Sequence, residues 1–110
     1  SSRPQKAPQK GAFFIMPHYV YILYSAGIDS FYKGQTNDLE SRITRHNQGG
    51  EKYTKRGIPW VLVWSTEKAS RSDAILLERK LKNLSREKTI TFIKKYRAGS
   101  SPDALLLLKQ

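Results

Sequence analysis

The fold is decided by a stretch that reads YVYILYSAGIDSFYKGQT, residues 19–36. Residues 19–24 are aromatic, β-branched or otherwise apolar, which is typical of a β-strand. Residues 25–30 contain Ser, Gly and Asp, which favour a turn. Residues 31–36 then read as the returning strand. A tight connection of this kind predicts an antiparallel pair.

Downstream of this hairpin the pattern changes to that of a helix, predicted over residues 38–46. Asn37 is its expected N-cap, because Glu40 follows three residues later and would complete a capping box. The Gly-Gly pair at 49–50 is expected to end the helix. A polar loop then follows over residues 51–59.

The second half of the chain predicts one more strand and two more helices. Residues 60–64, WVLVW, are apolar enough for a strand buried on both faces. Either Ser70 or Ser72 caps the next helix, and Ser85 caps the last one. The apolar stripe of the first of these helices consists of Ala74, Leu77, Leu81 and Leu84. The last helix carries Ile90, Ile93 and Tyr96.

The resulting order is strand, strand, helix, strand, helix, helix. It predicts the α/β (α+β) class, with a small three-stranded antiparallel sheet flanked by helices. A length of 110 residues fits one domain, which we assign to residues 17–98. Residues 1–16 are expected to be a disordered lead, partly added ahead of a native start at Met16. Residues 99–110 form a tail in which we expect a short helix.

Composition restricts the classes of function. The chain has 20 Lys and Arg against 9 Asp and Glu, a formal net charge of +11. This charge favours an anionic partner, namely nucleic acid, an acidic membrane surface or an acidic protein. The absence of cysteine excludes disulfides and thiolate zinc sites, and it suits the reducing cytoplasm, where we expect the protein to act. No apolar run is long enough to cross a bilayer.

Three groups of residues could carry chemistry. Glu78 shares the core-facing stripe of its helix, where a carboxylate needs either a salt bridge or a metal ion, and the salt bridge is the commoner outcome. Arg42 and His46 lie four apart on one helix face, which suits either phosphate binding and proton transfer or a solvated basic surface. Tyrosines in strands, such as Tyr21 and Tyr32, are usually structural.

The order of these residues is more informative than any one of them. Tyr19-Val20-Tyr21, Tyr32-Lys33-Gly34, Arg42, His46 and Glu78 follow one another in a series that resembles the GIY-YIG nuclease family. The likeness runs roughly from Tyr19 to Ile93 and is greatest to the small stand-alone bacterial members. Tyr19 replaces the first Gly of the first motif, and Lys33 replaces the middle Ile of the second. An Asn that some larger members carry downstream has no equivalent here.

The resemblance implies a metal-dependent endonuclease that hydrolyses phosphodiester bonds in DNA. One Mg²⁺ or Mn²⁺ ion would be held by Glu78, since hard cations prefer carboxylate oxygen. Arg42 would clamp the phosphate. Tyr21 or Tyr32 would take a proton from the attacking water, and His46 would be the base instead or relay the proton. These alternatives stay open at this point.

We expect sequence-independent backbone contacts from Lys33, Arg45, Lys52, Lys55 and Arg56. Nothing resembles a base-reading element, so we predict weak sequence preference and a role in DNA repair, recombination or processing. DNA is the favoured partner over RNA, without a membrane, and the protein is expected to be a monomer or weak homodimer. The alternatives are a non-catalytic nucleic-acid-binding module on the same scaffold and an interaction protein for an acidic partner.

Overall fold

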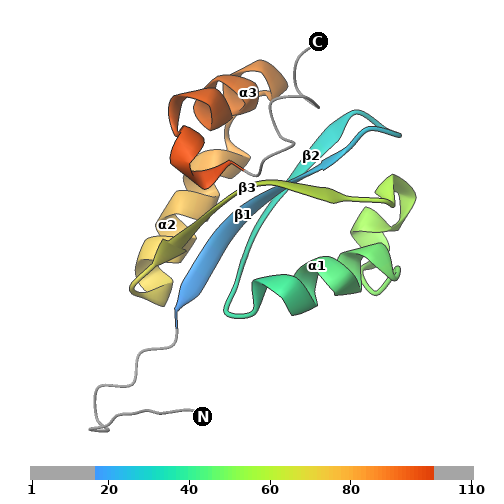
Figure 1. Ribbon diagram of the computed structural model, residues 1–110, viewed down its shortest axis with the longest axis horizontal. Helices are drawn as coiled ribbons and strands as arrows, with labels where there is room; N and C mark the ends of the chain where they lie inside the picture. The colour runs from blue at the N-terminus through green and yellow to red at the C-terminus, as the bar shows by residue number, and fades with distance from the viewer. Residues whose placement is uncertain (1–16, 101–110) are drawn as a thin grey trace, which may run out of the picture.

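The computed structural model describes residues 17–100, which form a three-stranded sheet flanked by helices (Figure 1). The elements are β1 (His18–Ser25), β2 (Ser30–Thr36), α1 (Leu39–Asn47), the 3₁₀-helix η2 (Lys52–Gly57), β3 (Val61–Lys68), α2 (Arg71–Lys82), α3 (Arg86–Lys95) and the 3₁₀-helix η3 (Arg97–Gly99). The predicted class and order of strands and helices are confirmed. The predicted lead and nearly all of the tail lie outside the described residues.

β1 is the central strand of the sheet, whose order is β2-β1-β3, and both neighbours are antiparallel to it. Residues 20–25 of β1 are all buried. The prediction that the third strand is buried on both faces is wrong, because β3 lies at the sheet edge and its Val61 is 40% exposed. An apolar composition alone does not distinguish a central strand from an edge strand. Trp60 is buried but precedes the strand.

Alternation along β1 divides the core into two layers. Val20, Ile22 and Tyr24 face a large apolar cluster that includes Ala74 and Leu81 of α2 and Ile93 of α3; we call this side the α2–α3 face. Tyr21 and Leu23 point to the opposite side, where they pack with Trp60, and partly buried Ile43 of α1 covers them; we call this side the α1 face. Figure 1 shows the helices on opposite sides of the sheet.

The helix caps refine the sequence prediction. The N-cap of α1 is Asp38 rather than Asn37, and its side chain accepts a hydrogen bond from the backbone N–H of Ser41 at 3.2 Å. The predicted capping box is therefore wrong, because the helix starts one residue later and Glu40 falls within its first turn. Of the two candidate serines, Ser70 caps α2, and Ser85 caps α3 as predicted.

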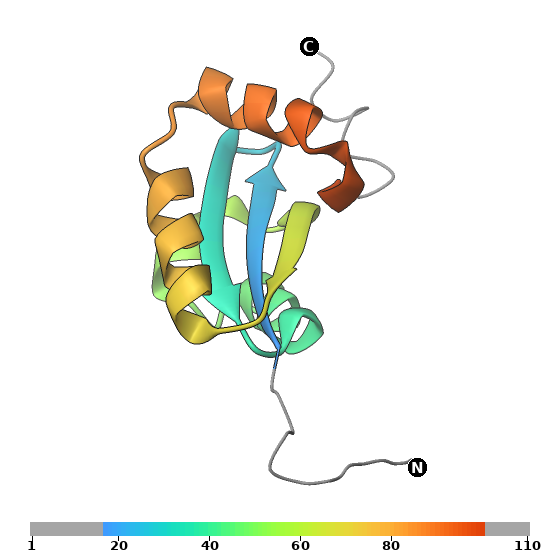
Figure 2. The same ribbon diagram turned by 90° about the vertical axis from the view of Figure 1, so that its left-hand side faces the viewer.

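A contact at the hairpin turn joins the hairpin to α3. Asp29, in the hairpin turn, accepts hydrogen bonds from the Tyr24 hydroxyl at 2.6 Å and from Arg86 of α3 at 2.9 Å. α2 lies along the β2 edge of the sheet (Figure 2), and this arrangement brings Glu78 to the same edge as Tyr32. Within residues 17–100, no helix is long and apolar enough to span a membrane.

Candidate active site

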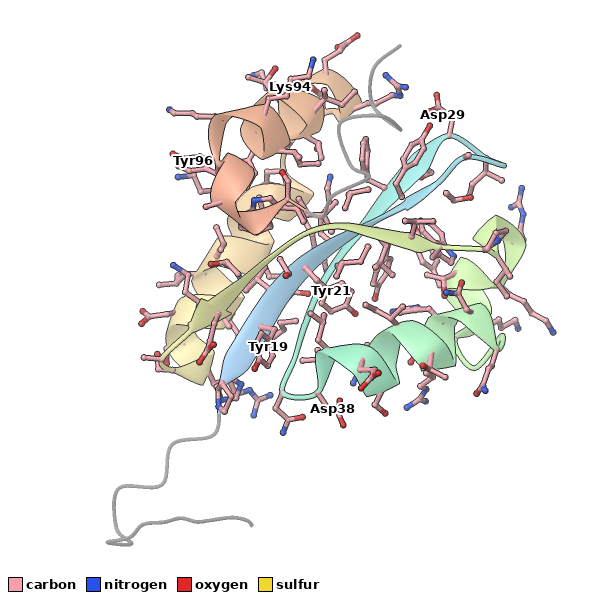
Figure 3. The ribbon with its side chains drawn as sticks, viewed as in Figure 1. Tyr19, Tyr21, Asp29, Asp38, Lys94 and Tyr96 are labelled. Carbon is pink, nitrogen blue, oxygen red and sulfur yellow. The ribbon has the colours of Figure 1, made fainter. Side chains whose placement is uncertain are left out.

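A buried chain of hydrogen bonds crosses the α1 face. The Tyr21 hydroxyl lies 3.2 Å from Nε2 of His46, and Nδ1 of His46 lies 2.8 Å from Oγ1 of Thr54. Oγ1 of Thr54 in turn donates to the backbone carbonyl of Glu51 at 3.3 Å. All three side chains are essentially inaccessible to solvent, and Figure 3 shows Tyr21 in the layer between the sheet and α1.

The direction of these hydrogen bonds determines which ring nitrogen of His46 carries the proton. A threonine hydroxyl has one proton, and here that proton goes to the Glu51 carbonyl. Thr54 Oγ1 must therefore accept from Nδ1–H of His46. The neutral ring is then left with a lone pair on Nε2, which accepts the Tyr21 hydroxyl proton. Thr54 thus orients the imidazole so that its basic nitrogen faces Tyr21.

The electrostatics keep both partners neutral at rest. Burial lowers the pKa of His46 below its ordinary value, and the nearby Arg42 and Arg45 lower that pKa further, whereas Glu51 raises it. Burial, with a smaller contribution from Tyr32, raises the pKa of Tyr21 far above its usual range, and Arg42 opposes this shift by charge and hydrogen bonding. At neutral pH the site therefore holds a phenol that donates to a neutral imidazole.

Tyr32 and Gly34 complete the wall of this site on β2. The ring centroid of Tyr32 lies 4.8 Å from that of His46 and 6.3 Å from that of Tyr21. Gly34 is paired across the strands with Tyr21. A Cβ atom on Gly34 would come within 2.7 Å of the Tyr21 hydroxyl oxygen. Glycine is therefore required here so that the phenol can lie over the neighbouring strand.

Glu78 lies on α2, the helix beside the β2 edge of the sheet. Its side chain is only 17% exposed and forms a salt bridge of 3.0 Å with Lys82, one turn further along the helix. Burial is the main reason that the pKa values of Tyr21 and Tyr32 are raised, and the charge of Glu78 adds a smaller contribution in the same direction. The salt bridge expected as the commoner outcome is present, and the carboxylate remains beside the candidate catalytic groups.

The structure thus brings Tyr21, Tyr32, Arg42, His46 and Glu78 near one another. The residues expected to contact the DNA backbone are more dispersed. Lys52, Lys55 and Arg56 are exposed on η2 beside the site, and Arg45 is paired with Glu51 at 3.1 Å. Lys33 points to the other face, where its ammonium donates to the Leu84 carbonyl at 3.5 Å and burial lowers its pKa.

Sequence reasoning missed the residues that hold η2 against the site. The Trp60 indole N–H donates to the Thr54 carbonyl at 2.7 Å. The Asn47 side chain binds the backbone of Trp60 in both directions, at 3.0 and 2.6 Å. These contacts place Thr54 against His46, across a loop whose spacing carries no periodic signal. The predicted polar loop is in fact an ordered 3₁₀-helix in its central part.

Comparison with known proteins agrees with this geometry. The model of the GIY-YIG catalytic domain matches residues 17–97. The chain belongs to the GIY-YIG family. This family is one of nucleases that generally use a divalent metal ion.

The similarity spans most of the length of the relatives of this GIY-YIG domain. The domain is 42% identical to a UPF0213 protein of Staphylococcus haemolyticus over 77 residues, which are 69% of this chain and 93% of that one. A UPF0213 protein of the archaeon Natronomonas pharaonis is 40% identical over 72 residues, 64% of this chain and 84% of the relative. The solution NMR structure of a UPF0213 protein from Bacillus halodurans superposes with a TM-score of 0.52 at 36% identity, covering 81% of this chain and 92% of that one. The names of these relatives state no activity.

Proposed function

We propose that this GIY-YIG domain is a metal-dependent endonuclease that hydrolyses phosphodiester bonds in DNA with weak sequence preference. Its role would lie in DNA repair, recombination or processing in the cytoplasm. The observation that carries the proposal is the hydrogen-bonded series Tyr21–His46–Thr54, directed so that a proton can leave the Tyr21 hydroxyl. A buried series of this kind is a proton path, and it lies beside a carboxylate and an arginine.

The raised pKa of Tyr21 decides how the proton moves. A free phenolate is unfavourable here, so Tyr21 acts as a relay rather than as a base that is already ionised. The substrate must first bring the attacking water to the Tyr21 oxygen, which is buried in the free protein. As this water attacks phosphorus, one of its protons passes to the Tyr21 oxygen, and the Tyr21 proton passes to Nε2 of His46. The bond from phosphorus to the leaving oxygen breaks, and that oxygen takes a proton from solvent. The charge of Glu51, which raises the pKa of His46, stabilises the imidazolium that forms.

Arg42 binds the phosphate in this proposal, and Tyr32 positions the attacking water. Arg42 lies on the same helix as His46 and close enough to Tyr21 to lower its pKa. Its guanidinium fork fits two phosphate oxygens and stabilises the negative charge that grows on them. Tyr32, whose ring centroid lies 6.3 Å from that of Tyr21, is the group that orients the attacking water.

The residues fit a metal ion that arrives with the substrate rather than one that is held permanently. Within residues 17–100 no group of three or more acidic, His or Cys side chains could enclose a metal. Glu78 supplies one carboxylate at the site and would hold a hard cation such as Mg²⁺ or Mn²⁺, which binds by preference to carboxylate oxygen. When bound, such an ion neutralises charge on the phosphate and on the leaving oxygen. Lys82 holds the same carboxylate in the free protein.

Glu78→Gln is the variant that tests this proposal. It keeps the shape of the side chain but removes the metal-binding charge, so we expect cleavage of a panel of linear and branched DNA with Mg²⁺ or Mn²⁺ to fall by about 10³-fold or more. DNA affinity should change little. Glu87→Gln, an exposed carboxylate on α3, is the matched control and should cleave normally.

Two results would overturn the proposal. Cleavage that survives in Glu78→Gln would show that Glu78 is not the residue that binds the metal ion. A wild type that binds DNA but never cuts it with either ion would favour the alternative, a non-catalytic binding module. Binding by Lys52, Lys55 and Arg56 should weaken steeply with salt in both cases, because contacts to phosphate release counterions.

A further inference from the structure

Tyr53 is the most exposed large apolar side chain in the described part of the chain, at 87% of its full accessible surface. It stands on η2, next to the buried Thr54 that orients His46. Its ring centroid lies 6.4 Å from that of Tyr32, and this is its one ring contact within residues 17–100. An aromatic ring held at the rim of the candidate active site contributes little to the core, and its face is accessible to a ligand.

Tyr53 separates two hollows that meet at Tyr32. One hollow has a volume of about 340 Å³ and is lined by aromatic walls from Tyr53, Tyr32 and Trp60, with the cation of Arg56 among them. The other has a volume of about 490 Å³ and is lined by the same two tyrosines and by Lys82, as well as by Lys33, whose ammonium is directed to the Leu84 carbonyl. Flat aromatic surfaces on one side and the ammonium of Lys82 on the other suit the two halves of a nucleotide, its base and its phosphate.

We propose that the aromatic hollow binds one unpaired nucleobase of a DNA strand, stacked on Tyr53, while the strand's phosphate lies towards Lys82. This inference rests on the proposed function and names the substrate class: DNA in which a nucleotide next to the cleaved bond is single-stranded or extruded. The hollow's volume is at the low end of the range for small-ligand sites, which fits a single base.

The requirement for an unpaired base follows from geometry. In a duplex both faces of each base are covered by its neighbours, so a protein ring can stack only on a base that has left the stack. Stacking on an aromatic side chain is tolerant of sequence, because every base has a π-face. The site therefore selects structure without reading sequence, as expected of a chain with a basic surface and no base-reading element. Arg56 adds a cation beside the stacked ring.

The test is a binding measurement in the Glu78→Gln background, so that it does not depend on cleavage. A short single-stranded DNA carrying 2-aminopurine is titrated with this protein and with versions that also carry Tyr53→Ala, Tyr53→Phe or Tyr96→Ala. Tyr96 is a matched control, since it is an exposed tyrosine at the end of α3, far from Tyr21 in Figure 3.

We expect quenching of the 2-aminopurine fluorescence, and a dissociation constant that rises by about 5-fold to 100-fold in Tyr53→Ala. Tyr53→Phe, which keeps the ring, and Tyr96→Ala should bind as the parent does. Affinity for a perfect duplex of the same sequence should change by less than about twofold in Tyr53→Ala. Equal losses on duplex and single strand, or no loss on either, would overturn the base-binding site.

A cleavage assay with the protein that keeps native Glu78 tests the base-binding site and the proposed endonuclease activity separately. If it cuts DNA but Tyr53→Ala does not lower its preference for unpaired substrates, the base-binding site is wrong and the endonuclease stands. If it cuts nothing while ring-dependent quenching persists, the base-binding site stands and the endonuclease is wrong.

Discussion

The two faces of the sheet bury different chemistry, although both are built on the same strand. On the α2–α3 face, Ile22 of β1 packs into an apolar cluster with Leu81 and Ile93. Tyr21, which precedes Ile22 in the strand, points to the α1 face, into a layer that also buries His46 and Thr54. Buried polar groups are costly unless they are paired, and the hydrogen-bonded series provides that pairing.

This difference indicates how a small domain separates its main hydrophobic core from its candidate active site. Period-two alternation along β1 sends successive side chains to opposite layers, so one strand serves both. The apolar face carries eight buried hydrophobic residues and the other face three, and most of the burial free energy therefore lies on the side away from the chemistry. Substitutions on the two faces should consequently affect different measurements.

The largest effect on activity is expected from Tyr21→Phe, which keeps the ring and removes the relaying hydroxyl. Proton-transfer groups of this kind contribute about 10²–10⁴-fold to rate, and a loss of that size should appear in single-turnover cleavage. The free energy of unfolding, measured with urea, should fall by only about 1–3 kcal/mol because Nε2 of His46 loses its partner. Tyr32→Phe is the matched control, and a larger loss of rate in Tyr32→Phe would exchange the roles of the two tyrosines.

Ile93→Ala should give the opposite result. Ile93 is fully buried on α3, a helix that carries none of the candidate catalytic residues. Truncation should lower the free energy of unfolding by about 2–5 kcal/mol, while the folded fraction cleaves at the parent rate. Leu76→Ala, at an exposed position on α2, is the control and should stay within about 0.5 kcal/mol of the parent. A folded Ile93→Ala protein with impaired chemistry would show that the two layers are coupled.

The sequence predicted the α2–α3 face better than the α1 face, and the reason is physical. Periodicity reports burial, so the stripe of Ala74, Leu77 and Leu81 was recognisable, and the structure packs it into the core. Aromatic and β-branched residues gave the hairpin in the same way. Composition does not give the order of the strands, which is why the apolar third strand was predicted to be buried on both faces although it lies at the sheet edge.

The site was predicted in part. The ordered series of Tyr21, Tyr32, Arg42, His46 and Glu78 came from resemblance to a family, because no single member has a periodic signature. Thr54 and Tyr53 were missed, since their importance depends on how η2 folds back over His46. That path is set by the contacts of Trp60 with Asn47 and with the Thr54 carbonyl, which join residues on both sides of an irregular segment.

The smallest effect, and the finest test of the α1 face, is the pH dependence of cleavage. His46 must be neutral to accept the Tyr21 proton, and burial lowers its pKa below the ordinary value near 6.5. Activity should therefore be complete above about pH 6.5 and should fall only as the pH drops through that lowered pKa. Glu51→Gln keeps the backbone carbonyl that binds Thr54 but removes a charge that raises the pKa of His46. The acid limb of the rate profile should then move to still lower pH. A limb that moves upwards, or one that persists in a still active His46→Gln protein, would mean that a group other than His46 takes the proton.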